Sequence, residues 1–307
     1  MQKEIKEIIE KDGTRFYRIT TSDSRWYAKE SKNVITGLPE MKFFPSVTWI
    51  KNYYYTSPYL INWIAEKGLT EADRIKKEAG TKGDKIHQAT QDIDKGLEIK
   101  IDDKYLNKEN GEMEELTIDE IEAIQSYVDY LEIEKPDILA TEKTVFCENQ
   151  DYEYAGTLDR IWAKGEVREG VRQIYVVDFK TSQSVRKDMI IQVSAYSHSD
   201  IDYKEFGITD EEWNNRKLLI LQLGYKGYRT YGKPKYKETE VNDRYDLFDI
   251  AYKSWKEENN NTGPLQRDFP MVLKSDFRIN QLKKSSKKST KKKIKKTVKK
   301  IKIWKQH

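Results

Sequence analysis

The sequence predicts an α/β fold, and three kinds of local pattern carry this prediction. Residues 174–180 alternate with the period of two that is expected of a β-strand with two different faces. Residues 218–223 form a continuous apolar run, which is typical of a strand buried on both faces. Residues 117–131 and 185–197 place apolar side chains at helical spacing, so helices are expected between and before the strands.

The first 45 residues are predicted to be rich in β-strands. Arg15–Thr20 and Arg25–Ala28 consist largely of strand-forming residues, and the turn-like segment Thr21–Ser24 separates them. No function is assigned from this segment.

Residues 46–135 are predicted to be mainly helical. Ser46 is a suitable N-cap for the first helix. Further helices are expected at residues 59–67, 71–94 and 117–131. Residues 95–117 are polar and irregular, and they are expected to form a loop, while Lys135-Pro136 ends the last of these helices.

Aromatic side chains are concentrated at the start of this helical region. They are Trp49, Tyr53, Tyr54, Tyr55, Tyr59 and Trp63. The i, i+4 spacing of Trp49 and Tyr53 favours packing in a helical core. The alternative is that some of these rings stack on unpaired bases, as they do in proteins that bind single strands.

Residues 136–258 are predicted to form the sheet and its closing helix. The expected strands are residues 142–148, 154–162, 174–180, 218–223 and a basic, tyrosine-rich strand or hairpin at 225–237. The expected helices are residues 185–197 and 241–258. A linker begins at residue 259 and leads into a lysine-rich tail.

Two acidic residues and a lysine are predicted to meet at one end of this sheet. The linker 164–171 holds two glycines and four charged residues, so the strands on either side of it are expected to form a hairpin. Such a hairpin brings Asp159 close to Asp178, and Lys180 lies on the same strand face as Asp178. Two carboxylates beside an ammonium indicate a metal site with a cation next to it.

An acid-x-Lys pattern alone carries no weight in a chain this charged, since Glu4-x-Lys6 and Asp102-x-Lys104 also have it. The ordered combination is more specific. Its parts are Gly83-x-x-x-His87, Gly156-x-x-Asp159, Val-Val-Asp-Phe-Lys-Thr at 176–181 and Gln192-Val-Ser-Ala-Tyr196. This set, which spans about residues 45–196, resembles the PD-(D/E)XK nuclease superfamily, in particular its RecB-like branch with the phage exonucleases and the CRISPR-adaptation nucleases.

The resemblance implies a restriction-endonuclease-like core, in which a mixed sheet is flanked by helices, and metal-dependent hydrolysis of DNA. Asp159, Asp178, the Phe179 carbonyl and His87 are then the expected ligands of Mg²⁺ or Mn²⁺, and an imidazole suits manganese better than magnesium. A lone histidine is otherwise usually structural. Glu142 is implied as a further acid of the site, although a surface glutamate at the start of a strand is the alternative.

The resemblance also implies roles for three more side chains. Lys180 would position the attacking water and stabilise developing negative charge. Gln192 would orient that water or a phosphate, and Tyr196 would hydrogen-bond the backbone of the nucleic acid. The alternative for Gln192 and Tyr196, which are neighbours at i, i+4, is a packing helix with a polar rim.

The single cysteine and the hydropathy pattern exclude several classes of protein. Cys147 alone cannot form an intrachain disulfide or the four-cysteine iron–sulfur cluster that many CRISPR-adaptation relatives hold. No apolar run approaches the length of a membrane span, and the N-terminus lacks the apolar core of a signal peptide. We therefore expect an intracellular protein with no membrane partner and no iron–sulfur cluster. The family resemblance alone suggests a bacterial or phage-infected cell.

The charge is distributed unevenly along the chain. The net charge is +4, but residues 281–307 contain 13 lysines and no acidic residue, so the preceding residues carry −9. Such a tail is typical of an arm that binds DNA phosphates without sequence preference. The alternative is a solubilising, disordered tail.

Taken together, these patterns predict a Mg²⁺- or Mn²⁺-dependent nuclease that acts on single- or double-stranded DNA. A helical N-terminal region of this kind arches over the site in the exonuclease relatives, so the resemblance favours an exonuclease in recombination, repair or phage DNA processing. The alternatives are a non-catalytic protein that binds nucleic acid on the same scaffold, and a nuclease subunit that works with a recombination protein partner. The sequence lacks GxxxxGK[ST], GxGxxG after a strand, GxSxG and HExxH, which argues against other common enzyme classes.

Overall fold

The structure is a computed structural model. It describes residues 4–9, 15–21, 24–32, 37, 39–54, 56–107, 110–168, 170–227, 235–259 and 263–264. These residues all belong to one compact unit, which ends at Pro264. The lysine-rich tail, and the expectations that concern it, lie outside the described residues.

The largest sheet of the described residues is mixed and has the strand order β11-β10-β9-β8-β7. Its strands are β7 (Asp137–Glu148), β8 (Glu153–Arg168), β9 (Val171–Lys180), β10 (Lys217–Leu223) and β11 (Tyr236–Val241). Only β9 and β10 are parallel; the other neighbours are antiparallel. A parallel pair needs a crossover connection, which the helical segment between β9 and β10 supplies. The predicted α/β class is confirmed.

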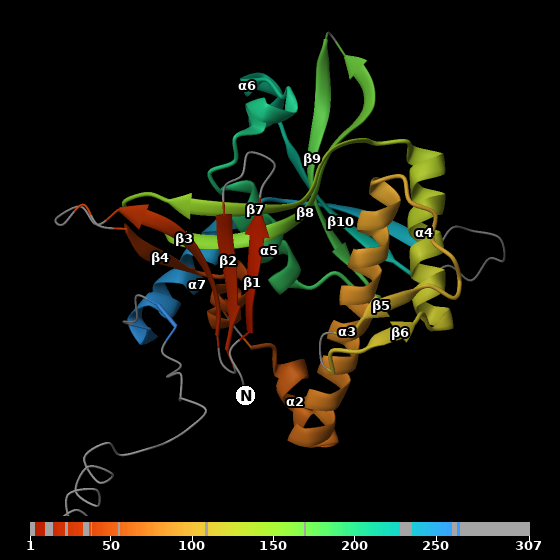
Figure 1. Ribbon diagram of the computed structural model, residues 1–307, viewed down its shortest axis with the longest axis horizontal. Coiled ribbons are helices and arrows are strands. Elements are labelled where there is room, and N and C mark those ends of the chain that lie inside the picture. The colour runs from red at the N-terminus through yellow and green to blue at the C-terminus, as the bar shows by residue number, and fades with distance from the viewer. Residues whose placement is uncertain are drawn as a thin grey trace, which may run out of the picture. The chain divides into compact units, whose positions relative to one another are not determined.

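Helices cover both faces of this sheet (Figure 1). On one side lie α3 (Leu69–Asp94) and α4 (Ile118–Glu134). On the other lie α1 (Val47–Ile50), the 3-10 turn η1 (Lys51–Tyr53), α5 (Lys187–Ser197) and α7 (Tyr245–Glu258). The alternation predicted for β9 follows these two layers, since Val176 packs in the apolar cluster that includes α5 and Val177 in the cluster that includes α3 and α4.

A second, antiparallel sheet precedes the helices. It consists of β1 (Glu4–Ile9), β2 (Arg15–Thr20), β3 (Arg25–Lys32) and β4 (Pro39–Pro45), in that order. It packs against the main sheet through a cluster of Tyr27, Phe44, Phe146 and Ala155. Strand-forming residues at 15–20 and 25–28 are thus in strands, as predicted.

The helix boundaries follow local capping chemistry. The Ser46 hydroxyl accepts a hydrogen bond from the Trp49 amide at 3.2 Å and caps α1, as predicted. Thr117 and Glu120 form a reciprocal capping box at the start of α4. This helix ends at Lys135, whose φ of 47° turns the chain out of the helix before Pro136. The helix α2 occupies Pro58–Lys67.

The aromatic side chains before and within α2 differ in their surroundings, so the core interpretation does not hold for all of them. The Trp49 ring lies 5.3 Å from each of the Trp26 and Trp255 rings and 6.5 Å from that of Tyr53, so the core interpretation is confirmed for Trp49 and Tyr53. Tyr59 is 86% exposed and packs in no core. Tyr55 lies outside the described residues.

Several element boundaries were wrong. The expected loop at 95–117 contains the two short paired strands β5 (Lys104–Leu106) and β6 (Met113–Glu115). The first core strand begins at Asp137 and not at Glu142, because β8 extends far enough to pair with the earlier residues.

Near the C-terminal end of the sheet, the strand expected at 225–237 is β11 at 236–241, and the closing helix therefore starts at Tyr245 and not at 241. Residues 228–234 lie outside the described residues. The short elements η2 (Tyr203–Phe206) and α6 (Asp210–Asn214) were not predicted, since four or five residues are too few to show periodicity. Within the described part of the chain, no helix combines the length and the apolar character that a bilayer span requires.

Candidate functional site

Three acidic residues line up across neighbouring strands of the main sheet. The predicted hairpin of β8 and β9 is confirmed, and because Arg160 pairs with Val177, Asp159 lies next to Asp178 in the register. On the other side of β8, Thr141 pairs with Arg160 and Lys143 with Leu158, which places Glu142 beside Asp159.

A histidine from α3 completes a cluster with two of these acids. His87 Nδ1 lies 3.3 Å from Glu142 Oε1 and 3.6 Å from Asp159 Oδ1. The nitrogen and one oxygen of each carboxylate all lie within 4.8 Å of one another. One imidazole nitrogen and two carboxylate oxygens are a donor set suited to a divalent first-row metal such as Mn²⁺.

The backbone of β7 is turned at Glu142. Its φ of 50° lies in the left-handed region, which non-glycine residues rarely adopt and which costs about 1–3 kcal/mol. The pairing of β7 with β8 continues on both sides of this residue. The strand therefore keeps its register while one side chain is redirected, and that side chain contacts His87 and Arg160.

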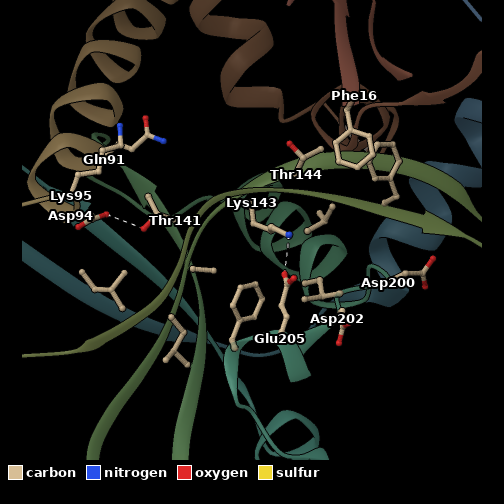
Figure 2. A pocket seen from close by; sticks show the side chains of 17 residues that line it. Phe16, Gln91, Asp94, Lys95, Thr141, Lys143, Thr144, Asp200, Asp202 and Glu205 are labelled. Carbon is tan, nitrogen blue, oxygen red and sulfur yellow. Dashed lines mark hydrogen bonds and ion pairs between the residues drawn. The ribbon is translucent and has the colours of Figure 1, made fainter. Parts of the chain in front are cut away.

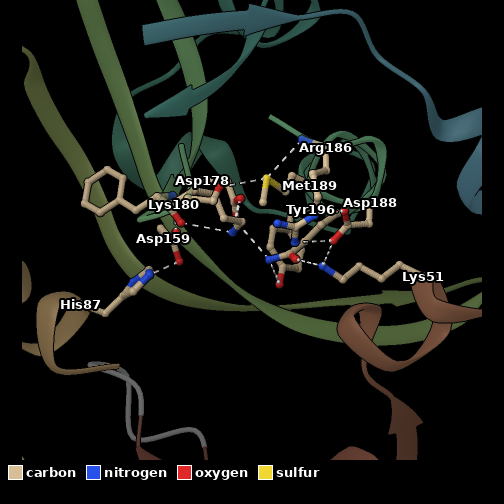
Figure 3. Close-up of polar contacts among 12 residues, drawn as sticks. Lys51, His87, Asp159, Asp178, Lys180, Arg186, Asp188, Met189 and Tyr196 are labelled. Carbon is tan, nitrogen blue, oxygen red and sulfur yellow. Dashed lines mark hydrogen bonds and ion pairs between the residues drawn. The ribbon is translucent and has the colours of Figure 1, made fainter. Parts of the chain in front are cut away.

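The two oxygens of Asp159 have separate partners. Oδ2 accepts a hydrogen bond from the Phe179 amide at 2.6 Å, and Oδ1 faces His87 (Figure 3). Burial raises the pKa of Asp159 to about 6, against the charge of His87, which lowers it. Burial lowers the pKa of His87, but the charges of Asp159 and Glu142 outweigh burial and raise it to about 9. The imidazole is therefore protonated at neutral pH, and it must lose this proton before its nitrogen can act as a ligand.

Asp178 is fully buried, and both of its oxygens face other side chains. Oδ1 accepts a hydrogen bond from Gln192 Nε2 at 3.0 Å, while Oδ2 forms a close ion pair with Lys180. Burial lowers the pKa of Lys180, but the charges of Asp178 and Asp159 outweigh it and the net direction is upward. Lys180 also donates to the Phe179 carbonyl at 3.1 Å.

The predicted pair Gln192 and Tyr196 lies behind Asp178. Gln192 Nε2 also donates to the Tyr196 hydroxyl at 3.2 Å, and both side chains are buried. A β-carbon at Gly156 would overlap the Tyr196 ring, so the glycine of Gly156-x-x-Asp159 is needed for this close approach. Gln192 thus contacts both Asp178 and Tyr196. The predicted contacts of Gln192 and Tyr196 with a substrate stay predictions.

The structure brings only some of the predicted site residues together as possible metal ligands. His87, Glu142 and Asp159 are brought together as possible ligands. The Asp178 carboxylate faces Gln192 and Lys180, and the Phe179 carbonyl faces Lys180.

Sequence reasoning missed Arg160. Its side chain is fully buried, with Nε 2.5 Å from Asp94 Oδ2 and Nη1 3.4 Å from Glu142 Oε1. Nη1 also donates to the Asp159 carbonyl at 2.7 Å. Arg160 therefore contacts both acids of the cluster, through the backbone carbonyl of Asp159 and the carboxylate of Glu142. The available signal was an arginine directly before the apolar residues Ile161 and Trp162 inside a predicted strand.

Sequence reasoning also missed Lys51. Its Nζ donates to Gln192 Oε1 at 2.6 Å and lies 3.4 Å from Asp188 Oδ2. Burial, followed by the positive charge of Lys180, lowers the pKa of Lys51. No local pattern marks this lysine, because its contacts lie on a helix far away in the sequence.

A separate cavity of about 880 Å³ borders the outer side of β7 (Figure 2). Phe16, Asp94, Thr141 and Asp200 contribute to its lining, and an ion pair between Lys143 and Glu205 at 2.9 Å crosses it. None of the predicted site residues lines it. Its lining includes Asp94, the partner of Arg160, and Thr141 and Lys143, the chain neighbours of Glu142.

Comparison with protein-family models gave no match for this chain, and comparison with curated proteins gave none either.

Proposed function

We propose that this protein is a metal-dependent nuclease that hydrolyses phosphodiester bonds in DNA. One observation carries the proposal: the possible ligand atoms of His87, Glu142 and Asp159 lie within 4.8 Å of one another. Asp159 lies next to Asp178 in the register, and Asp178 is paired with Lys180. A candidate cation site and a half-buried ammonium would thereby be combined at one place, and phosphoryl-transfer chemistry uses both.

The donor atoms fit a divalent cation. His87, Glu142 and Asp159 would hold Mg²⁺ or Mn²⁺. Asp178, whose Oδ2 is paired with Lys180, lies next to Asp159 in the register and borders this set. Such an ion polarises a phosphate and makes a bound water more acidic. The imidazole in the set favours Mn²⁺.

The protein's own groups would supply position and charge. Lys180, held between the Asp178 carboxylate and the Phe179 carbonyl, would stabilise negative charge that develops on phosphate oxygens. Gln192 and Tyr196 would hold Asp178 in place. Arg160 would hold Asp159 and Glu142. An exonuclease is the form that the resemblance to RecB-like nucleases favours.

The test is cleavage of end-labelled linear DNA and of closed circular DNA with Mg²⁺, Mn²⁺ or EDTA. We expect metal-dependent loss of the linear substrate by the wild type and a loss of activity of about 10²–10³-fold in Lys180→Met. Lys42→Met is the matched control, because Lys42 forms ion pairs with Glu148 and Glu153 away from the acidic cluster. Lys42→Met should cleave like the wild type.

The remaining outcomes separate the alternatives. Cutting of the circle would make the protein an endonuclease with the same chemistry. Cleavage that persists in EDTA, or that Lys180→Met retains in full, would contradict the proposal. DNA binding that weakens with salt, without cleavage under any condition, would favour a non-cleaving binding protein or a subunit that needs its partner.

A further inference from the structure

Lys51 reaches the candidate site from a distant part of the chain. It begins the turn η1, which follows α1, and its side chain extends towards Tyr196 and Asp188 (Figure 3). Its ammonium contacts Gln192 on α5. The Lys51 side chain is only 13% exposed. A lysine is rarely this buried unless its charge has a partner. Its closest polar contact is the Gln192 amide oxygen at 2.6 Å, and the Asp188 carboxylate is farther away at 3.4 Å.

The chemistry of these groups fixes which way the Gln192 amide faces. An ammonium can only donate hydrogen bonds, so the amide atom in contact with Lys51 must be the oxygen. The amide nitrogen then faces the Asp178 carboxylate, which when ionised can only accept. The opposite orientation would place the amide oxygen against Asp178 and the amide nitrogen against Lys51, and both contacts would be repulsive.

We propose that Lys51 is a positioning residue: it fixes the orientation of the Gln192 amide and, through it, the Asp178 carboxylate. This inference rests on the proposed function, in which Asp178 borders the cation site. Lys180 contacts Oδ2 of Asp178 from the other side. The chain Lys51–Gln192–Asp178–Lys180 therefore holds both carboxylate oxygens. It presents Asp178 to the cation site in one orientation.

Replacing Lys51 by an uncharged residue would change the metal affinity in two ways, and these act in opposite directions. Removing a positive charge beside a cation site should tighten metal binding by Coulomb attraction alone. Loss of an outer hydrogen-bond partner weakens metal binding, typically by about 10- to 100-fold. The direction of the change therefore distinguishes positioning from a simple effect of charge.

The experiment is a Mn²⁺ titration followed by the EPR signal of free Mn²⁺, which needs no activity. It compares the wild type with Lys51→Met, Gln192→Met, the double variant and the control Lys42→Met. We expect about 10- to 100-fold weaker Mn²⁺ binding in each single variant, with no further loss in the double variant, because both act through the same contact. Lys51→Arg keeps a charged donor, and it should bind Mn²⁺ more tightly than Lys51→Met.

Several results would overturn the inference. Unchanged or tighter Mn²⁺ binding in Lys51→Met would do so, as would losses that add in the double variant. If Lys51→Met fails to fold, Lys51→Arg is compared with Gln192→Met instead. Equal Mn²⁺ affinities of these two variants would contradict the inference. If the wild type binds no Mn²⁺, the proposed function fails together with the inference. If the wild type binds and Lys51→Met binds equally well, the inference alone fails.

Discussion

The Phe179 amide donates a hydrogen bond to Asp159 Oδ2 at 2.6 Å, and this contact ties β8 to β9 beyond their last paired residues, Arg160 and Val177. It occupies one carboxylate oxygen and leaves the other directed at His87, 3.6 Å away. The same side chain is therefore both a structural acceptor and a possible ligand.

Asp159→Asn separates these two roles. The asparagine oxygen can still accept from the Phe179 amide, so the fold should be kept, with a thermal midpoint within about 5 °C of the wild type. The charge that would hold a cation is lost, and Mn²⁺ binding and metal-dependent cleavage should disappear. Asp151→Asn, at an exposed position before β8, is the control. Retention of Mn²⁺ binding and cleavage by Asp159→Asn would contradict the assigned role.

Glu142 offers a test of backbone strain. Glu142→Ala and Glu142→Gly both remove the carboxylate, but only glycine adopts a φ of 50° without steric cost. We expect Glu142→Gly to be more stable than Glu142→Ala by about 1 kcal/mol in urea denaturation. The reverse order, which is the usual one within a β-strand, would show that the turned backbone does not persist in solution.

Arg160 and Asp94 should behave as a buried ion pair. Arg160→Met leaves the buried Asp94 carboxylate without its positive partner, which should cost about 3–5 kcal/mol of the free energy of unfolding. Adding Asp94→Asn removes the remaining charge and keeps an acceptor for the Tyr127 hydroxyl, 2.5 Å from Asp94. The double variant should therefore regain part of the lost stability in urea denaturation. A double variant less stable than Arg160→Met would refute this account.

Arg172 and Glu212 predict a pH dependence of stability. The hydrogen bond from the Arg172 guanidinium, at 2.8 Å, lowers the pKa of Glu212 from 4.5 to about 2. Because the folded-state pKa is depressed, the stabilisation is fully present above pH 4.5 and is lost as the pH falls towards 2. The free energy of unfolding, measured by urea denaturation, should thus fall between pH 5 and pH 2 by about 2 kcal/mol less in Arg172→Met than in the wild type.

The exposed pair Arg244–Asp246 is the control for this measurement. Both of its side chains are more than a third exposed, so Arg244→Met should change stability by less than about 1 kcal/mol. A wild type and an Arg172→Met variant with the same pH profile would rule out the proposed linkage.

The sequence by itself determined the features that depend on near neighbours. Period two in residues 174–180 predicted a two-faced strand, and the glycines of 164–171 predicted the hairpin that sets Asp159 beside Asp178. The cap at Ser46 followed from side-chain chemistry within a few residues. Such patterns are readable because a helix or strand repeats over short distances in the chain.

Only the tertiary structure decided which distant side chains meet these strands. His87 reaches Glu142 from a helix 55 residues away, and Lys51 reaches Gln192 across 141 residues. The redirected backbone at Glu142 also has no local signature. Periodicity states which face of an element is buried, but it does not state what lies against that face. That is settled by the packing of whole helices on the sheet, where the polar groups that are buried must find one another as partners.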